Sequence, residues 1–168
     1  FGGFGGGRGN FDARGRLQLS IYYTLELEDT ILIRDGVPAL DLLNGSAIGS
    51  NGGQPRHSVQ FQSGYSRDGF GLRLNADYKS ATTVNGGASG GERLDFSDIA
   101  TVNLRLFADL TARRSLIRKY PWLRGSRVTL GIDNLFDARQ HVTDQNGVVP
   151  LTYQPGYVDP IGRTIRLS

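Results

Sequence analysis

The chain has 168 residues, enough for one domain, yet only 38% are hydrophobic and 24 are glycine, which disfavours a thick buried core. Its formal net charge is +3, and all of its 19 cationic residues except Lys79 and Lys119 are arginine, which suits fixed pairing with carboxylates. There is no cysteine for a disulfide framework, and no run approaches the ~20 apolar residues of a membrane-spanning helix, so crossing a bilayer would require strands in a closed barrel.

Residues 1–15 are a low-complexity segment of Gly, Phe and Arg that buries too little surface to offset its chain entropy. We expect a flexible connector there. A nucleic-acid-binding tail is the alternative, but Arg8, Arg14 and Arg16 are its only cations, so no nucleic-acid partner is expected. Without an initiator Met or a secretion signal, we interpret the chain as a mature fragment that begins elsewhere.

Residues 16–27 alternate strictly between apolar and polar side chains, which predicts a long strand. The strand is expected to continue through residues 30–34, until the turn residues 35–38 break it. A long loop rich in Gly, Asn and Ser then runs to Pro55.

The same alternation predicts further strands in the rest of the chain, joined by connections of unequal length. The predicted strands are residues 58–65, 72–79, 99–110, 127–133 and 161–168. A tight Asp68-Gly69 turn joins the first two, because Gly supplies the positive φ that a hairpin needs. Residues 80–93 and 141–160 are predicted to be long loops, and residues 111–125 a medium connection.

Each predicted strand carries an apolar face and a polar face. In a water-soluble sandwich the apolar face would be the core, whereas in an outer-membrane barrel it would contact lipid and the polar face would line a wet lumen. The alternation of long and short connections favours the barrel. Aromatic residues fall near the predicted strand ends, as membrane-interface girdles would: Tyr65, Phe70, Tyr78 and Trp122.

The last third of the chain carries a recognisable pattern. An alternating strand ends in Asn134, Leu135, Phe136 and Asp137, and a loop then leads through residues 150–153 to Asp159, Pro160, Gly162 and Arg163 at the start of the final strand. With the turn at residues 118–125 and the Gly-rich connector, this resembles the C-terminal end of a TonB-dependent outer-membrane receptor, of the alphaproteobacterial, sphingomonad-like type.

The resemblance implies an all-β fold, in which residues 16–168 supply about six C-terminal strands of a 22-stranded antiparallel transmembrane barrel. It also implies partners: outer-membrane lipid, the rest of the barrel and its plug, and the TonB complex through an N-terminal part. Two features depart from the family. The chain stops at Ser168 where the family ends on an aromatic residue, and it lacks the plug and the TonB box.

In a complete barrel, charged residues of the polar faces should line the lumen and pair across strands. These candidates are Arg73, Asp77, Arg105, Asp109, Asp133 and Arg166. We expect them chiefly to solvate the wall or to contact a plug, with direct contact to a transported ligand as the alternative.

Catalysis finds little support in the sequence. His57 and His141 are the only histidines and lack neighbours at metal-ligand spacing, and residues 144–147 are better explained as an Asn-Gly turn than as a calcium loop. We therefore expect no enzyme, metal or cofactor. The expected function is uptake of a scarce ligand, an iron chelate such as a siderophore, cobalamin or a glycan, across the bacterial outer membrane. A structural or adhesive barrel completed by oligomerisation, and a secreted β-sandwich binding module, are the alternatives.

Overall fold

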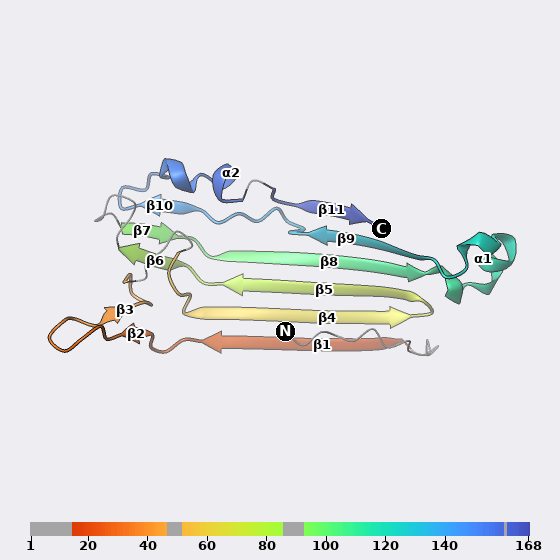
Figure 1. Ribbon diagram of the computed structural model, residues 1–168, viewed down its shortest axis with the longest axis horizontal. Helices are drawn as coiled ribbons and strands as arrows, with labels where there is room; N and C mark the ends of the chain where they lie inside the picture. The colour runs from red at the N-terminus through yellow and green to blue at the C-terminus, as the bar shows by residue number, and fades with distance from the viewer. Residues whose placement is uncertain (1–14, 47–51, 86–92, 160) are drawn as a thin grey trace.

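The computed structural model describes residues 15–46, 52–85, 93–159 and 161–168, so the connector predicted before residue 15 lies almost wholly outside the described residues, and so does Pro160. The fold is mostly antiparallel β-sheet with few helices (Figure 1). Its main element is a six-stranded sheet in the order β1-β4-β5-β8-β9-β11. The strands are β1 (Arg16–Leu25), β4 (His57–Arg67), β5 (Phe70–Lys79), β8 (Ile99–Asp109), β9 (Arg127–Asp133) and β11 (Thr164–Leu167).

These six strands are the predicted ones, and each pairs antiparallel with the next. Strands β1 and β11 form the two edges, so the described strands make an open sheet and close no barrel. The predicted hairpin turn joins β4 to β5, with Asp68 and Gly69 at φ values of 49° and 80°.

The connections fall into two groups at opposite ends of the sheet (Figure 1). At one end lie the β4–β5 turn and the β8–β9 connection, which contains η1 (Leu110–Ala112), α1 (Arg114–Lys119) and η2 (Pro121–Leu123). The three long connections lie at the other end. Within the described part of the chain, no helix has both the length and the apolar character needed to cross a membrane.

The long connections contain small sheets that the sequence analysis missed. A three-stranded sheet has the order β10-β7-β6, and a two-stranded sheet pairs β2 with β3. The strands are β6 (Thr82–Asn85), β7 (Arg93–Phe96), β10 (Val142–Asp144), β2 (Thr30–Ile31) and β3 (Leu40–Asp41). The last connection also contains η3 (Leu151–Tyr153) and α2 (Pro155–Val158), which follow β10. The segments predicted as long loops therefore contain short strands, and the predicted continuation of the first strand was wrong, because that strand ends at Leu25 before the separate β2.

The buried core of the described residues lies in the small three-stranded sheet. It consists of Val84, Leu94, Phe96 and Val142, each 3% exposed or less. The ring of Tyr153 packs edge-on against Phe96, with centroids 5.6 Å apart. The large sheet contributes no residue to this core. Its stability must therefore come from its hydrogen-bonded ladder and from whatever contacts its faces.

Candidate functional site

One face of the six-stranded sheet is apolar across all six strands. Residues paired directly opposite in an antiparallel ladder point to the same face, so the register identifies the members of each row. One complete row, in strand order, is Leu17, Tyr65, Leu72, Leu106, Leu130 and Leu167. The neighbouring row is Leu19, Ser63, Leu74, Leu104, Ile132 and Ile165.

This apolar face is exposed, most of all toward the two edge strands. Leu17 and Leu19 on β1 are 62% and 60% exposed, and Ile165 and Leu167 on β11 are 66% and 74% exposed. Isolated apolar residues on a protein surface are ordinary, but contiguous rows of this extent mark an interaction surface.

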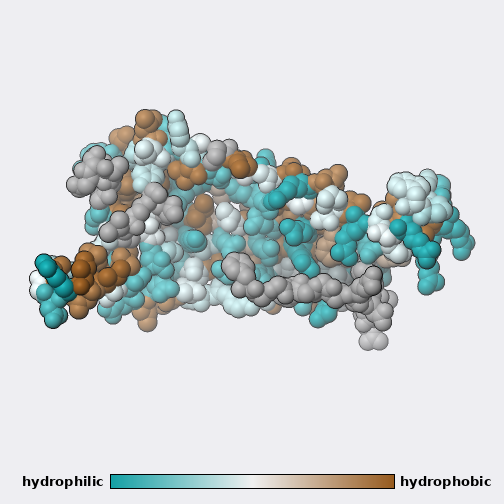
Figure 2. Space-filling model, in the orientation of Figure 1, coloured by the Kyte–Doolittle hydropathy of each residue, from teal (hydrophilic) through white to brown (hydrophobic). Residues whose placement is uncertain are grey.

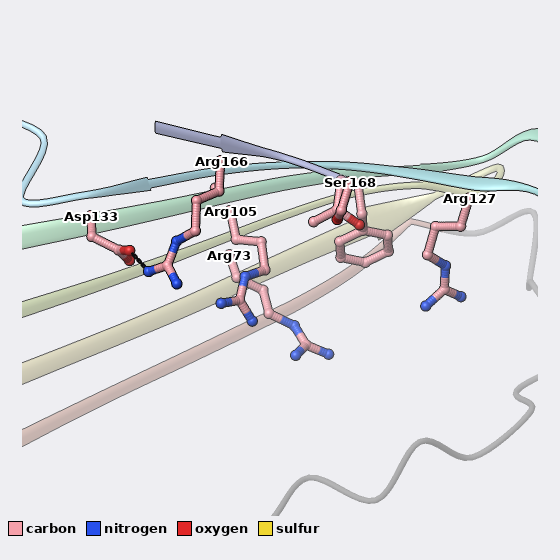
Figure 3. Close-up of a pocket in the computed structure, with 9 residues that line it drawn as sticks. Arg73, Arg105, Arg127, Asp133, Arg166 and Ser168 are labelled. Carbon is pink, nitrogen blue, oxygen red and sulfur yellow. Dashed lines mark hydrogen bonds and ion pairs between the residues drawn. The ribbon is translucent and has the colours of Figure 1, made fainter. Parts of the chain in front are cut away.

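The opposite face carries the polar side chains, and Figure 2 shows hydrophilic residues over most of the middle of the sheet. One row of this face holds three arginines: Arg73 lies opposite Arg105, Arg105 opposite Gly131, and Gly131 opposite Arg166. Figure 3 shows the three arginine side chains projecting to the same side of the sheet. They border a hollow of about 400 Å³, which we call the arginine hollow. Its lining includes Arg73, Arg105, Phe107, Arg127, Gly131 and Arg166.

The aromatic ring of Phe107 lines one side of the arginine hollow and lies close to two of its arginines. Phe107 lies in the row next to the arginines, and the guanidinium carbons of Arg73 and Arg127 lie 5.8 Å and 5.6 Å from its ring centroid. Both distances fall within the range of cation–π attraction. The ring therefore restrains two guanidinium groups whose charges face the hollow.

Two of the four arginines at the hollow have carboxylate partners. Arg166 forms an ion pair with Asp133, marked by a dashed line in Figure 3, and Arg127 lies 3.7 Å from the carboxylate of Asp109. Within the described ranges, no carboxylate lies within 4 Å of a guanidinium nitrogen of Arg73 or Arg105. The hollow therefore has an excess of positive charge.

The structure places all six predicted lumen candidates on the polar face. It brings Asp133 to Arg166 and Asp109 to Arg127 as opposite-charge pairs, as predicted for neighbouring strands. Asp77 instead lies opposite Thr101, and Arg73 lies opposite Arg105. The prediction of opposite-charge pairing therefore fails at these two positions of β5. Sequence reasoning also missed Arg127, although it continues the polar alternation of β9 through Thr129 and Asp133.

The residues of the family-like pattern meet at one junction. Asn134 and Asp137 have positive φ values of 51° and 53°, and the side chain of Asn134 hydrogen-bonds both the backbone N–H and the carbonyl of Ala138. A carboxylate oxygen of Asp137 accepts the backbone N–H of Arg163 at 3.0 Å. Asp159 in turn accepts the N–H of Gly162 at 3.0 Å.

This junction couples the end of β9 to the start of β11, and we call it the β9–β11 clamp. Arg163 extends it by donating to the carbonyl of Leu135, whereas the Phe136 side chain is 72% exposed. The pattern thus has a local structural role: it fixes the chain where a long connection returns to the sheet.

The four predicted interface aromatics divide between the two ends of the sheet. Phe70, Tyr65 and Trp122 lie at the end with the short turn, where they are 49%, 42% and 77% exposed. Tyr78 lies near the end with the long connections, in the row of Val59 and Tyr23. By register, Tyr65, Phe70 and Tyr78 all belong to the apolar face.

The two histidines lie at the end of the sheet that carries the long connections, where His57 begins β4 and His141 precedes β10. The ring of His57 stacks on Tyr23 and its Nδ1 lies 2.9 Å from the tyrosine hydroxyl, while the backbone N–H of His141 donates to Ser97. Residues 144–147 form the predicted turn, in which the Asp144 carboxylate accepts two backbone N–H groups at 2.8 Å. No group of three metal-ligating side chains occurs within the described ranges.

Comparisons with models of protein families, with curated proteins and with solved structures found no match to this chain.

Proposed function

We propose that the chain is part of the transmembrane barrel of a TonB-dependent receptor in the bacterial outer membrane. Such a receptor takes up a scarce ligand, an iron chelate, cobalamin or a glycan, with energy supplied from the inner membrane. In this proposal the apolar face contacts lipid and the polar face lines the lumen.

The observation that carries the proposal is the exposure of the apolar rows. The described part of the chain has a small core of its own, yet that core leaves the apolar residues of the large sheet uncovered. In water such rows would favour aggregation, whereas lipid tails would solvate them at no cost. A strand with lipid on one face and a wet lumen on the other needs this alternation.

The dimensions of the apolar face also support a membrane location. Phe70 and Tyr78 are eight residues apart on β5, about 27 Å along the strand at about 3.4 Å per residue and about 21 Å along the membrane normal at a barrel tilt of about 40°. The apolar band of outer-membrane barrels is about 25 Å tall and is bounded by aromatic residues at both interfaces. The spacing of Phe70 and Tyr78 is therefore close to the height of such an apolar band.

The two ends of the sheet fit opposite sides of such a membrane. Outer-membrane barrels have short turns on the periplasmic side and long loops outside. The β4–β5 turn and α1 would then be periplasmic, and the small sheets extracellular. A hollow of about 510 Å³ lies among the long connections, lined in part by Arg56, His57 and Asp95. We assign the initial capture of the ligand to this extracellular end.

Six strands are too few for a barrel, since single-chain bacterial barrels have at least about eight. The backbone groups of the β1 and β11 edges would each cost several kcal/mol if left unpaired in hydrocarbon. We therefore propose that further strands of the same polypeptide pair with both edges and that its plug fills the lumen. The plug would also connect the receptor to TonB.

The test is expression of the full polypeptide in a Gram-negative host with and without active TonB. We expect heat-modifiable migration of the outer-membrane fraction on a gel, and ligand accumulation only with active TonB. Heat-modifiable insertion without TonB-dependent accumulation would indicate a structural or adhesive barrel instead. A compact monomer in detergent-free buffer, with its leucines protected, would indicate a soluble module and would refute the membrane assignment.

A further inference from the structure

We propose that the arginine hollow is an oxyanion site, in which Arg73 and Arg105 together bind a carboxylate or phosphate group inside the barrel. This inference rests on the proposed function only in placing the polar face in a lumen. The anion could belong to a free solute or to a carboxylate-bearing segment of the polypeptide, and the test below distinguishes these sources.

The first argument is the register. Residues directly opposite in an antiparallel ladder have Cβ atoms about 4.5–5.5 Å apart, and like charges at such a pair destabilise the sheet. Arg73 and Arg105 occupy one such pair. An anion bound between the two guanidinium groups would turn this repulsion into attraction.

The second argument is that the strands carrying Arg73 and Arg105 already have a neighbouring strand on each side. Strand β5 lies between β4 and β8, and β8 lies between β5 and β9, so neither arginine sits on an edge where another strand could be added. A counter-charge for the pair must therefore approach from the open side of the polar face. The arginine hollow lies on that side.

The third argument is preorganisation. Phe107 restrains Arg73 from one side, as described above, and Gly131 next to Arg105 has no side chain to fill the space toward Arg166. Guanidinium groups bind carboxylate and phosphate through pairs of parallel hydrogen bonds, for which a fixed orientation is favourable. Arg166 is already paired with Asp133, so we assign the binding contacts to Arg73 and Arg105.

The experiment measures thermal unfolding of the full polypeptide in detergent micelles, titrated with inorganic phosphate or citrate at constant ionic strength. The test variant is R73Q/R105Q. The control is K79Q, which removes a cation from the same face of β5, outside the hollow. If a free anion binds, phosphate or citrate will raise the unfolding temperature of the wild type and of K79Q. Its apparent affinity will fall at least about tenfold in R73Q/R105Q.

A second measurement identifies an internal anion. If carboxylates of the polypeptide occupy the site, added anions will have little effect, but the wild type will lose stability as the pH falls and those carboxylates are protonated. R73Q/R105Q will lack that part of the pH dependence, whereas K79Q will retain it.

The proposal is overturned if R73Q/R105Q matches K79Q in both measurements. It is also overturned if R73Q alone raises stability at every pH and added phosphate or citrate leaves the wild type unchanged, because the pair would then be repulsive with no anion bound from either source. Failure of the polypeptide to enter the outer membrane would instead refute the proposed function, and the micelle measurements would still decide the anion site.

Discussion

Gly71 on β5 lies directly opposite Phe107 on β8, and the phenyl ring covers the glycine on the polar face. A Cβ atom added at Gly71 would overlap that ring. Aromatic cover of a cross-strand glycine is a recognised means of stabilising a sheet. Here it also places the ring between the guanidinium groups of Arg73 and Arg127.

Gly71→Ala should therefore destabilise the sheet by about 1–3 kcal/mol, the usual cost of overpacking, because the Phe107 ring has to move. Chemical unfolding in detergent measures the loss. Gly131→Ala is the matched control on the same face, since a Cβ there meets no atom within 4 Å. Equal effects of the two substitutions would contradict the assigned position of the ring.

Leu130→Arg should impair insertion into the membrane. Leu130 belongs to the apolar face, where a guanidinium costs about 2–4 kcal/mol at the bilayer midplane and less toward the interfaces. Thr129→Arg, one residue away on the polar face, should be far milder. The measurement is the heat-modifiable fraction in purified outer membranes. A similar loss is expected for Leu104→Arg on β8, in the row midway between Phe70 and Tyr78, and losses of similar size for Leu130→Arg and Thr129→Arg would argue against lipid contact.

Asp137→Gly should loosen the β9–β11 clamp by about 1 kcal/mol, because the backbone N–H of Arg163 loses its acceptor while glycine still adopts the positive φ at this position. We expect faster hydrogen exchange at the backbone amides of Arg163 and Thr164, and unchanged exchange at the amides of the β4–β5 ladder. Asp35→Ala serves as the control, because the Asp35 side chain is exposed in a turn and makes none of the described hydrogen bonds. Unchanged exchange at Arg163 would show that the clamp does not hold the strand.

The turn after β3 should open at low pH. The side-chain amide of Asn44 and then the backbone N–H groups of Leu43 and Asn44 lower the pKa of Asp41 below its usual range, despite partial desolvation. Because the folded pKa is depressed, the stabilisation is present above the unfolded pKa and is lost as the pH falls through the folded value. An NMR titration of the carboxyl carbon measures this pKa. Asn44→Ala should raise it, whereas Asn146→Ala should leave it unchanged.

Strands β1, β4, β5, β8 and β9 could be predicted because each has at least seven residues over which its alternation can be read, whereas β11 has only four and was predicted with the help of the sequence pattern that precedes it. Strand β1 repeats the pattern over ten residues, and the Asp68-Gly69 turn fixes the hairpin that follows. Strands β6, β7 and β10 have only three or four residues each, too few to establish a period. Their pairing depends on contacts between distant segments, such as Val142 with Phe96, which local pattern does not encode.

The polar face was predicted, but the arginine hollow was not. Alternation assigns Arg73 and Arg105 to the same face, whereas their direct opposition depends on the register between β5 and β8. Alternation fixes that register only to within shifts of two residues, because the connection between the two strands is too long to fix the pairing as a tight turn does. The expectation that opposite charges would pair across the ladder was therefore correct for Asp133 with Arg166 and for Asp109 with Arg127, and wrong for Arg73 and Arg105.

The location of the buried core has a calorimetric consequence. The heat capacity of unfolding rises chiefly when apolar groups enter water. Val84, Leu94, Phe96 and Val142 would do so when the small sheet melts, whereas the leucines of the large sheet would exchange lipid or detergent for a similar environment. The enthalpy of melting the small sheet should therefore rise more steeply with temperature, and the end that carries the long connections could loosen while the six-stranded sheet stays intact.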